Sequence, residues 1–135
     1  MENLRYKFRV WDKYTEEMYN VESLHIEDEY VDLFKTSIYE KRSDNPWAKI
    51  SDVILMQCTG LKDKNGVAIY EGDVLHFEPF ENHGNDRVVT YINGAYRGEL
   101  IRSGDSTLLS DCVYETKVIG NIYQNKELLE GDLNE

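Results

Sequence analysis

Hydrophobic and polar residues alternate strictly near the start of the chain. In LRYKFRVW, residues 4–11, the apolar side chains at every second position share one face, and the basic residues share the other face with Trp11. The polar segment DKYTEE follows, and MYNV then resumes an apolar rhythm. This pattern predicts a β-hairpin over residues 5–21 whose loop spans residues 12–16.

The segment 22–50 has a mixed pattern. Tyr30, Leu33, Phe34 and Ile38 stand near helical spacing, although LHI and YVDLF also alternate. We expect one short helix here, packed against the sheet. The run SDNP at residues 43–46 indicates a turn before the chain rejoins the core.

Glycine and Asn-Gly positions punctuate the middle of the chain. VILMQC, residues 53–58, is an apolar run short enough to be a buried strand. In the segment TGLKDKNGVAIYEGDVL that follows, Asn65-Gly66 and Gly72 indicate tight turns that need a positive backbone φ. A further strand, DVLHF, is predicted at residues 73–77.

Two more signals shape the C-terminal half. Asn93-Gly94 separates RVVTYI from AYRGELIR, which predicts a hairpin with a two-residue turn. The last strand, near residues 112–123, contains Gly120, where a bulge or sharp bend is expected.

Short strands with frequent turns are typical of a small, strongly bent sheet or a partly closed barrel. The predicted class is therefore mainly β with a minor α+β component. The 135 residues suit one domain. Within it we expect two subdomains that share a core, residues 1–50 with the hairpin and helix, and residues 51–135 with the barrel.

Charge and composition narrow the classes of partner. The net charge of −11 is spread along the chain and disfavours direct binding of nucleic acid, because phosphate backbones are bound mainly by Lys and Arg. No segment reaches the roughly 20 apolar residues of a membrane span, and MENLRYKFRV lacks a secretory apolar core, so a cytoplasmic protein without membrane contact is expected. Cys58 and Cys112 lack metal-type spacing and are expected to be buried thiols.

Candidate metal ligands cluster in one segment. His76, Glu78, Glu81 and His83 supply imidazole and carboxylate donors within eight residues. The spacing argues against a site, because Pro79 and the polar ENHGND loop should splay the later residues away from His76. A solvated loop is the favoured interpretation, and no cofactor is predicted.

Glu71 and Asp73 flank Gly72 and could be a general acid and base. Carboxylates beside a tight turn more often accept hydrogen bonds from backbone N–H groups. We expect this structural role, and no catalytic residues are predicted.

Three stretches together resemble a known family. They are KFRVWDKYTEEMY at 7–19, CTGLKDKNGVAIYEGDVL at 58–75 and VIGNIYQNKELLE at 118–130, and they resemble the YopX family of small phage and prophage proteins. The likeness implies a phage-encoded, mainly β protein that includes an SH3-like barrel, but it brings no established activity. The residues expected to define the fold are Gly60, Asp63, Asn65, Gly66, Tyr70, Gly72, Asp73, Gly120 and Asn121.

The leading functional hypothesis is a non-catalytic binding or assembly module that contacts a protein partner or forms a homo-oligomer. Ten tyrosines and two tryptophans support it, since such side chains dominate interface anchors. One alternative is an acidic nucleic-acid mimic that regulates a basic host protein. A third, less favoured hypothesis is a hydrolase-like enzyme that uses His76, Glu78 or His83.

Overall fold

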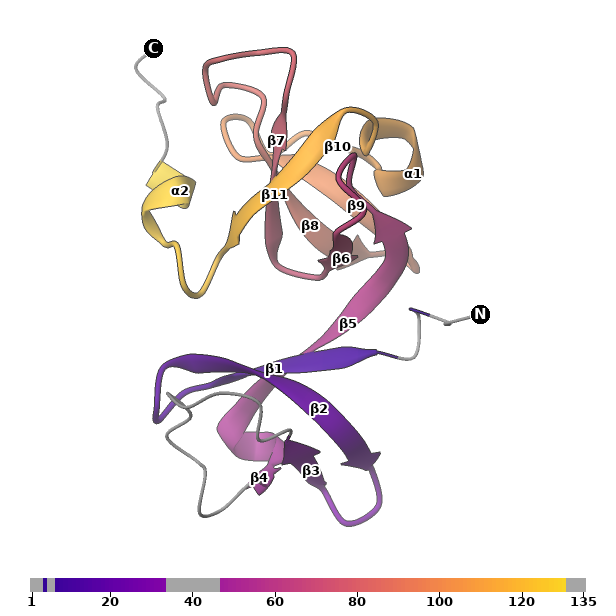
Figure 1. The fold of residues 1–135 in the computed structure, drawn as a ribbon, viewed down its shortest axis with the longest axis vertical. Coiled ribbons are helices and arrows are strands. Elements are labelled where there is room, and N and C mark those ends of the chain that lie inside the picture. Colours follow the sequence, from indigo (N-terminus) through magenta and orange to yellow (C-terminus); the bar gives the residue numbers. More distant parts are fainter. Residues whose placement is uncertain (1–3, 5–6, 34–46, 131–135) are drawn as a thin grey trace. The chain divides into compact units, whose positions relative to one another are not determined.

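A computed structural model describes residue 4 and residues 7–33 and 47–130 of the chain (Figure 1). The described residues are mainly β, which confirms the predicted fold class. They form two compact units, the first made of residues 7–57 and the second beginning at Cys58. The division expected between residues 50 and 51 lies slightly before this boundary.

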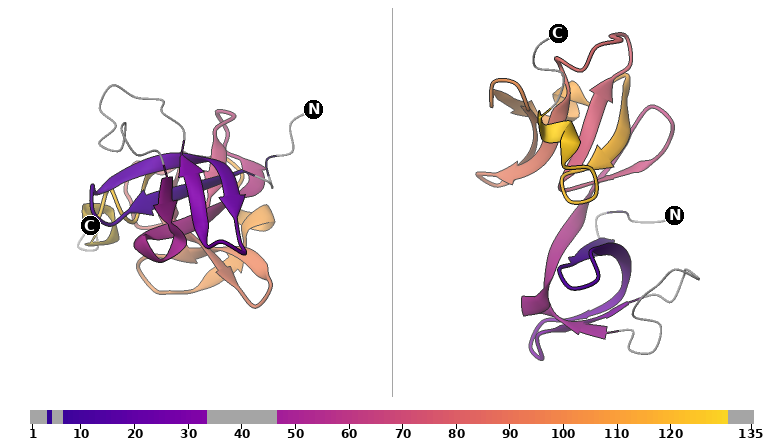
Figure 2. Two further views of the ribbon diagram at one scale, coloured as in Figure 1. Left: turned by 90° about the horizontal axis from the view of Figure 1, so that it is seen from below. Right: turned by 90° about the vertical axis from the view of Figure 1, so that its left-hand side faces the viewer.

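The first unit is an antiparallel sheet in the strand order β4-β3-β2-β1-β5. Its strands are β1 (Phe8–Asp12), β2 (Glu17–His25), β3 (Tyr30–Leu33), β4 (Trp47–Lys49) and the first part of β5 (Val53–Lys62), with a 3-10 turn, η2 (Ile50–Asp52), before β5. β1 and β2 form the predicted hairpin, and Glu16 closes its turn with a φ of 55° and a hydrogen bond to the Asp12 carbonyl. Figure 2 shows how strongly these strands curve.

The prediction of a helix within residues 22–50 is wrong for the part of this segment that the structure describes. Tyr30 and Leu33 lie on strand β3, in which Val31 and Leu33 are buried and the two residues between and before them are more exposed. The alternation with period two therefore outweighs the helical spacing, because β2 and β4 both hydrogen-bond to this segment. Phe34, Ile38 and the turn at 43–46 lie outside the described residues.

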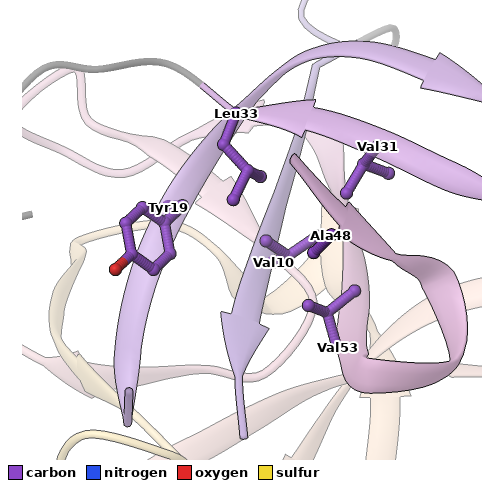
Figure 3. Close-up of a cluster of buried hydrophobic side chains, with 6 residues drawn as sticks. All are labelled: Val10, Tyr19, Val31, Leu33, Ala48 and Val53. Carbon is purple, nitrogen blue, oxygen red and sulfur yellow. The ribbon is translucent and has the colours of Figure 1, made fainter. Parts of the chain in front are cut away.

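One face of this sheet carries the core of the first unit (Figure 3). Alternate residues of neighbouring strands point toward one another there, and each apolar side chain that is fully buried contributes about 1.5–3 kcal/mol. The buried residues are Val10, Tyr19, Val31, Leu33, Ala48 and Val53.

The second unit contains a five-stranded antiparallel sheet in the order β10-β9-β8-β7-β11. Its elements are β6 (Ala68–Tyr70), β7 (Asp73–Phe77), β8 (Arg87–Ile92), β9 (Ala95–Leu100), β10 (Ser106–Leu108), α1 (Leu109–Cys112), β11 (Thr116–Asn121) and α2 (Glu127–Glu130). β10 and β11 are edges of this sheet, so the described strands form an open sheet and no closed barrel, which leaves the bent sheet of the two expected forms. The second part of β5 pairs with β6.

The inner face of this sheet is covered by β6 and α1. Ile69, Leu75, Val89 and Leu109 are all about 1% exposed or less and form the second core. Neither of the described α-helices has the length or the apolar character needed to cross a membrane.

The turns of the second unit follow the glycine signals. Gly66 and Gly72 have φ values of 81° and 84°, in the left-handed region that favours glycine. Asn93 and Gly94 both have positive φ and join β8 to β9, as the two-residue turn predicts. The register between β11 and β7 shifts between Val118 and Gly120, where a bulge was expected.

Two buried aspartates hold these turns together. One Asp63 oxygen accepts hydrogen bonds from the N–H groups of Asn65 and Val67 at 2.8 and 2.9 Å, and the other accepts from Val118 N–H at 3.0 Å. Asp73 accepts from Tyr70 N–H at 2.8 Å, which is the structural role expected for a carboxylate beside Gly72. Such bonds satisfy buried polar groups that would otherwise destabilise the fold.

The C-terminal end of β11 is organised in a similar way. Asn121 is 5% exposed, and its side-chain oxygen accepts hydrogen bonds from Tyr123 and Gln124 N–H at 3.0 and 2.9 Å. Its backbone N–H in turn donates to the Asn125 side chain at 3.1 Å. These local bonds end the strand and direct the chain into α2.

Candidate functional site

His76 lies near the end of β7, on the outer face of the five-stranded sheet. Side chains alternate along the strand, so Leu75 and Phe77 point to the inner face while Val74 and His76 point outward. The imidazole is nonetheless buried, with its side chain 8% exposed. A buried imidazole needs a polar partner.

The polar partner of His76 is Asp86, which lies at the other end of the loop between β7 and β8. Tight turns fold this loop, with hydrogen bonds from Phe80 N–H to the Phe77 carbonyl and from Asp86 N–H to the His83 carbonyl. β7 and β8 pair Leu75 with Arg87, so the same register carries Asp86 back to a place opposite His76.

His76, His83 and Asp86 therefore form a cluster, called here the His-Asp-His cluster. Asp86 accepts at 2.7 Å from His76 Nδ1 with one carboxylate oxygen and lies 2.9 Å from His83 Nδ1 with the other. The two imidazole centroids are 4.6 Å apart. The Asp86 side chain is 3% exposed and that of His83 is 37% exposed, so the cluster is buried on one side and open on the other.

The expected arrangement of ligands is only partly present. The expectation that the loop separates His83 from His76 is wrong, since the turns at residues 77–86 fold it back. Glu78 does not join the histidines but forms ion pairs with Lys64 and Lys117 at 3.4 and 3.7 Å. Of the three residues that the hydrolase hypothesis names, Glu78 therefore lies apart from His76 and His83.

No pattern in the sequence indicated Asp86 as a member of this cluster. Asp86 stands immediately before the strand RVVTYI, and a hairpin of suitable register would place it across from the HF pair of β7. That register depends on the number of residues in the loop that remain unpaired, which the alternation of the strands alone does not give. A histidine and an aspartate at the two ends of one polar loop were the available signal.

The donors of the cluster suit a divalent cation of the zinc type. One potential ligand atom from each of the three residues lies within 4.8 Å of the others. Two imidazoles and one carboxylate are ordinary ligands for zinc and for other late first-row metals. Without a metal, the same contacts fasten the loop to β7.

A second histidine–carboxylate pair lies in the first unit. His25 Nε2 is 3.0 Å from Asp32, which also accepts a 2.7 Å hydrogen bond from the Ser23 hydroxyl. These two hydrogen bonds, with Ser23 first, hold the pKa of Asp32 below its usual value of 3.8. The His25 ring also stacks on Tyr30 with centroids 4.1 Å apart.

Neither cysteine is arranged for reaction. Cys58 is buried, and burial raises the pKa of the Cys112 thiol above its usual value of 9.0. Cys112 lines a cavity of about 290 Å³ together with Phe77, Tyr114 and others, on the inner side of the sheet. A thiol with a raised pKa holds less thiolate at neutral pH and is a poor nucleophile.

The outer face of the same sheet is hollowed into an apolar groove of about 330 Å³, called here the outer groove. It is lined by Val88, Thr90, Glu99, Leu100, Ile101, Ile122 and Leu129. The Thr90 hydroxyl oxygen is buried there and has no hydrogen-bond partner among the described residues. By strand register Ile92 and Leu108 lie on the same face of the sheet, and they are 38% and 42% exposed.

Comparison with known proteins places this fold. The crystal structure of protein EF1440 from Enterococcus faecalis is similar, with 30% sequence identity over 91% of this chain and 96% of that chain, and a TM-score of 0.65. The X-ray crystal structure of protein yopX from Bacillus subtilis shares the fold, with 20% identity over 92% and 98% of the two chains and a TM-score of 0.57. A search of curated proteins gives no match. The family model described as YopX protein matches residues 7–130, and the chain therefore belongs to the YopX family.

Proposed function

We propose that the protein is a binding or assembly module without catalytic activity, which contacts a protein partner or a second copy of itself. The observation that carries this proposal is the outer groove and its apolar surroundings. On a fully solvated sheet face, the outward positions of each strand would carry polar residues. Instead, its exposed rim carries Ile92, Leu108 and Leu129, which are each about two-fifths exposed.

The strand register explains why these side chains form one surface. Thr90 of β8 stands opposite Arg97 of β9, and Arg97 stands opposite Leu108 of β10, so the three side chains cross the outer face in a row. Ile92 follows Thr90 by two positions and points to the same side. The register therefore places these side chains on one face that runs across three neighbouring strands, which supports the proposal.

Two further features favour a protein as the occupant of the outer groove. The buried Thr90 hydroxyl lacks a partner among the described residues, and a backbone group of an incoming chain could supply one. β10 is also an edge strand of the sheet, and edge strands can pair with an added strand. Both features suit a polypeptide better than a small apolar ligand.

The test compares the double variant Ile92→Asp/Leu108→Asp with Tyr114→Asp as a matched control. Tyr114 is 71% exposed and lies outside the outer groove. Light scattering over a range of concentrations gives the oligomeric state, and capture from host lysate compares bound proteins. We expect the double variant to lose the self-association or the captured protein that Tyr114→Asp retains. Equal behaviour of both variants would remove the outer groove as the contact face.

The net charge of −11 favours a second candidate, a regulator that imitates nucleic acid and binds a basic host protein. Under this second proposal the protein is phage-encoded and acts in the cytoplasm of the host cell. Binding of a basic partner would weaken steeply as salt is raised, because exposed charges are screened. A complex whose affinity is unchanged between low and high salt would count against this candidate.

A further inference from the structure

The His-Asp-His cluster is more than a hydrogen-bonded support for the loop. In the first unit Asp32 is bound by one imidazole, that of His25, and by a serine hydroxyl. In the cluster a second imidazole approaches the Asp86 carboxylate at 2.9 Å, from a loop that is folded back to bring it there. We propose that His76, His83 and Asp86 bind one zinc ion or a chemically similar divalent cation.

The donor set selects the class of metal. Imidazole nitrogens suit zinc, cobalt, nickel and copper, whereas magnesium and calcium prefer oxygen ligands throughout. Zinc bound by three protein ligands keeps a fourth position, which water takes at a site that opens to solvent. Binding through Nδ1 leaves each imidazole neutral, with its proton on Nε2.

The geometry requires only a small closure. Bonds of about 2.0–2.1 Å in a tetrahedron place ligand atoms roughly 3.3 Å apart. The three ligand atoms lie within 4.8 Å of one another, so no pair has to approach by more than about 1.5 Å, while His76 Nδ1 and its Asp86 oxygen, now 2.7 Å apart, have to separate slightly. His83 can make this movement because its side chain is 37% exposed and lies on a loop, whereas His76 and Asp86 are held by the sheet.

The cluster gives an ion a route from solvent and holds its ligands in place. His76 and Asp86 are 8% and 3% exposed, so they offer a preformed and partly dehydrated pair. His83 lies on the open side and gives the ion a route from solvent. The Asp86 carbonyl also accepts a 3.1 Å hydrogen bond from Ile101 N–H, which fixes the backbone of this ligand to the turn that follows β9. Support of this kind orients metal ligands.

The test is a titration of the full chain with zinc chloride, followed by calorimetry, and with cobalt chloride, followed by visible absorption. We expect one ion per chain, a tetrahedral cobalt spectrum, and no comparable binding of magnesium. His83→Ala should weaken zinc binding roughly tenfold or more, since even indirect support of metal ligands changes affinity by about 10–100-fold. His83 is on the surface, so this variant should remain folded.

His25→Ala is the matched control, because His25 is also partly exposed and 3.0 Å from a carboxylate but belongs to no group of three ligands among the residues that the structure describes. It should bind zinc as the unchanged protein does. The proposal is overturned if the protein takes up no stoichiometric zinc, if His83→Ala binds it unchanged, or if His25→Ala weakens binding as much as His83→Ala. If the protein bound magnesium as tightly as zinc, the proposal that the imidazoles are metal ligands would be overturned.

Discussion

Gly98 of β9 is the position where one added methyl group has the clearest consequence. A Cβ atom there would stand 2.7 Å from Cys112 Sγ and 3.0 Å from Arg87 Cδ, whereas ordinary contacts are 3.4–4 Å. The Arg87 side chain crosses this residue to donate a 2.7 Å hydrogen bond to its carbonyl. The missing side chain therefore makes room for both neighbours.

We expect Gly98→Ala to destabilise the second unit. Overpacking of this kind costs about 1–3 kcal/mol, and the reduced freedom of the unfolded chain returns about 0.4–1 kcal/mol. The expected net loss is about 1–2 kcal/mol. In a folding unit of roughly 60–100 residues, a range that includes the second unit, each kcal/mol lowers the melting temperature by roughly 4–8 °C. Gly84→Ala, whose Cβ would meet nothing closer than 3.3 Å, should change stability by less than about 0.5 kcal/mol.

The double variant Gly98→Ala/Cys112→Ala identifies the cause. Without Sγ the new methyl group loses its closest clash, although Arg87 Cδ still lies 3.0 Å away, so the double variant should recover most of the loss relative to Cys112→Ala alone, a coupling of about 1–2 kcal/mol. Urea denaturation followed by the NMR signals of Val89 and Leu109 reports on the correct unit, because both tryptophans lie in residues 7–57. Additive losses in the two single variants would refute the steric reasoning.

Three further expectations concern other parts of the molecule. Gly72→Val should lose about 1–2 kcal/mol, because its φ is 84°; unchanged melting would refute this. Asp63→Asn should lose about 1–3 kcal/mol in urea denaturation, because an amide nitrogen cannot accept the bonds that both carboxylate oxygens accept now. Ser23→Ala should raise the pKa of Asp32 toward 3.8 in an NMR titration, since the Ser23 hydrogen bond is the largest cause of its lowering.

The last expectation has a defined sign for stability. The folded-state pKa of Asp32 lies below its unfolded value, so its contribution is fully present above the unfolded pKa and is lost as the pH falls through the folded pKa. Ser23→Ala should narrow the pH range, between the folded and unfolded pKa values of Asp32, over which this contribution to stability changes. If the unfolding free energies of both proteins fall in parallel between neutral pH and pH 3, the hydrogen bond does not stabilise the ionised carboxylate.

Local chemistry explains which features were predicted from the sequence. Gly72 and the Asn93-Gly94 pair specify their own backbone conformations, so their turns follow from residue type alone. The strand at Tyr30 did not follow, because its neighbours in the sheet decided between two patterns that the segment also contains. Asp86 required the register of a hairpin whose loop folds on itself, and the open edges of β10 and β11 depend on pairing over long distances.

The hydrogen bond between Asp63 and Val118 joins residues 55 positions apart. At 5–20 residues per second, the ribosome adds the strand that carries Val118 roughly 3–11 s after Asp63. During that interval β7, four of whose five residues are buried in the finished fold, has no β11 beside it. A nascent chain stalled before Thr116 would present this normally buried strand with an unpaired edge, and it is the intermediate that we expect chaperones to bind and proteases to cleave.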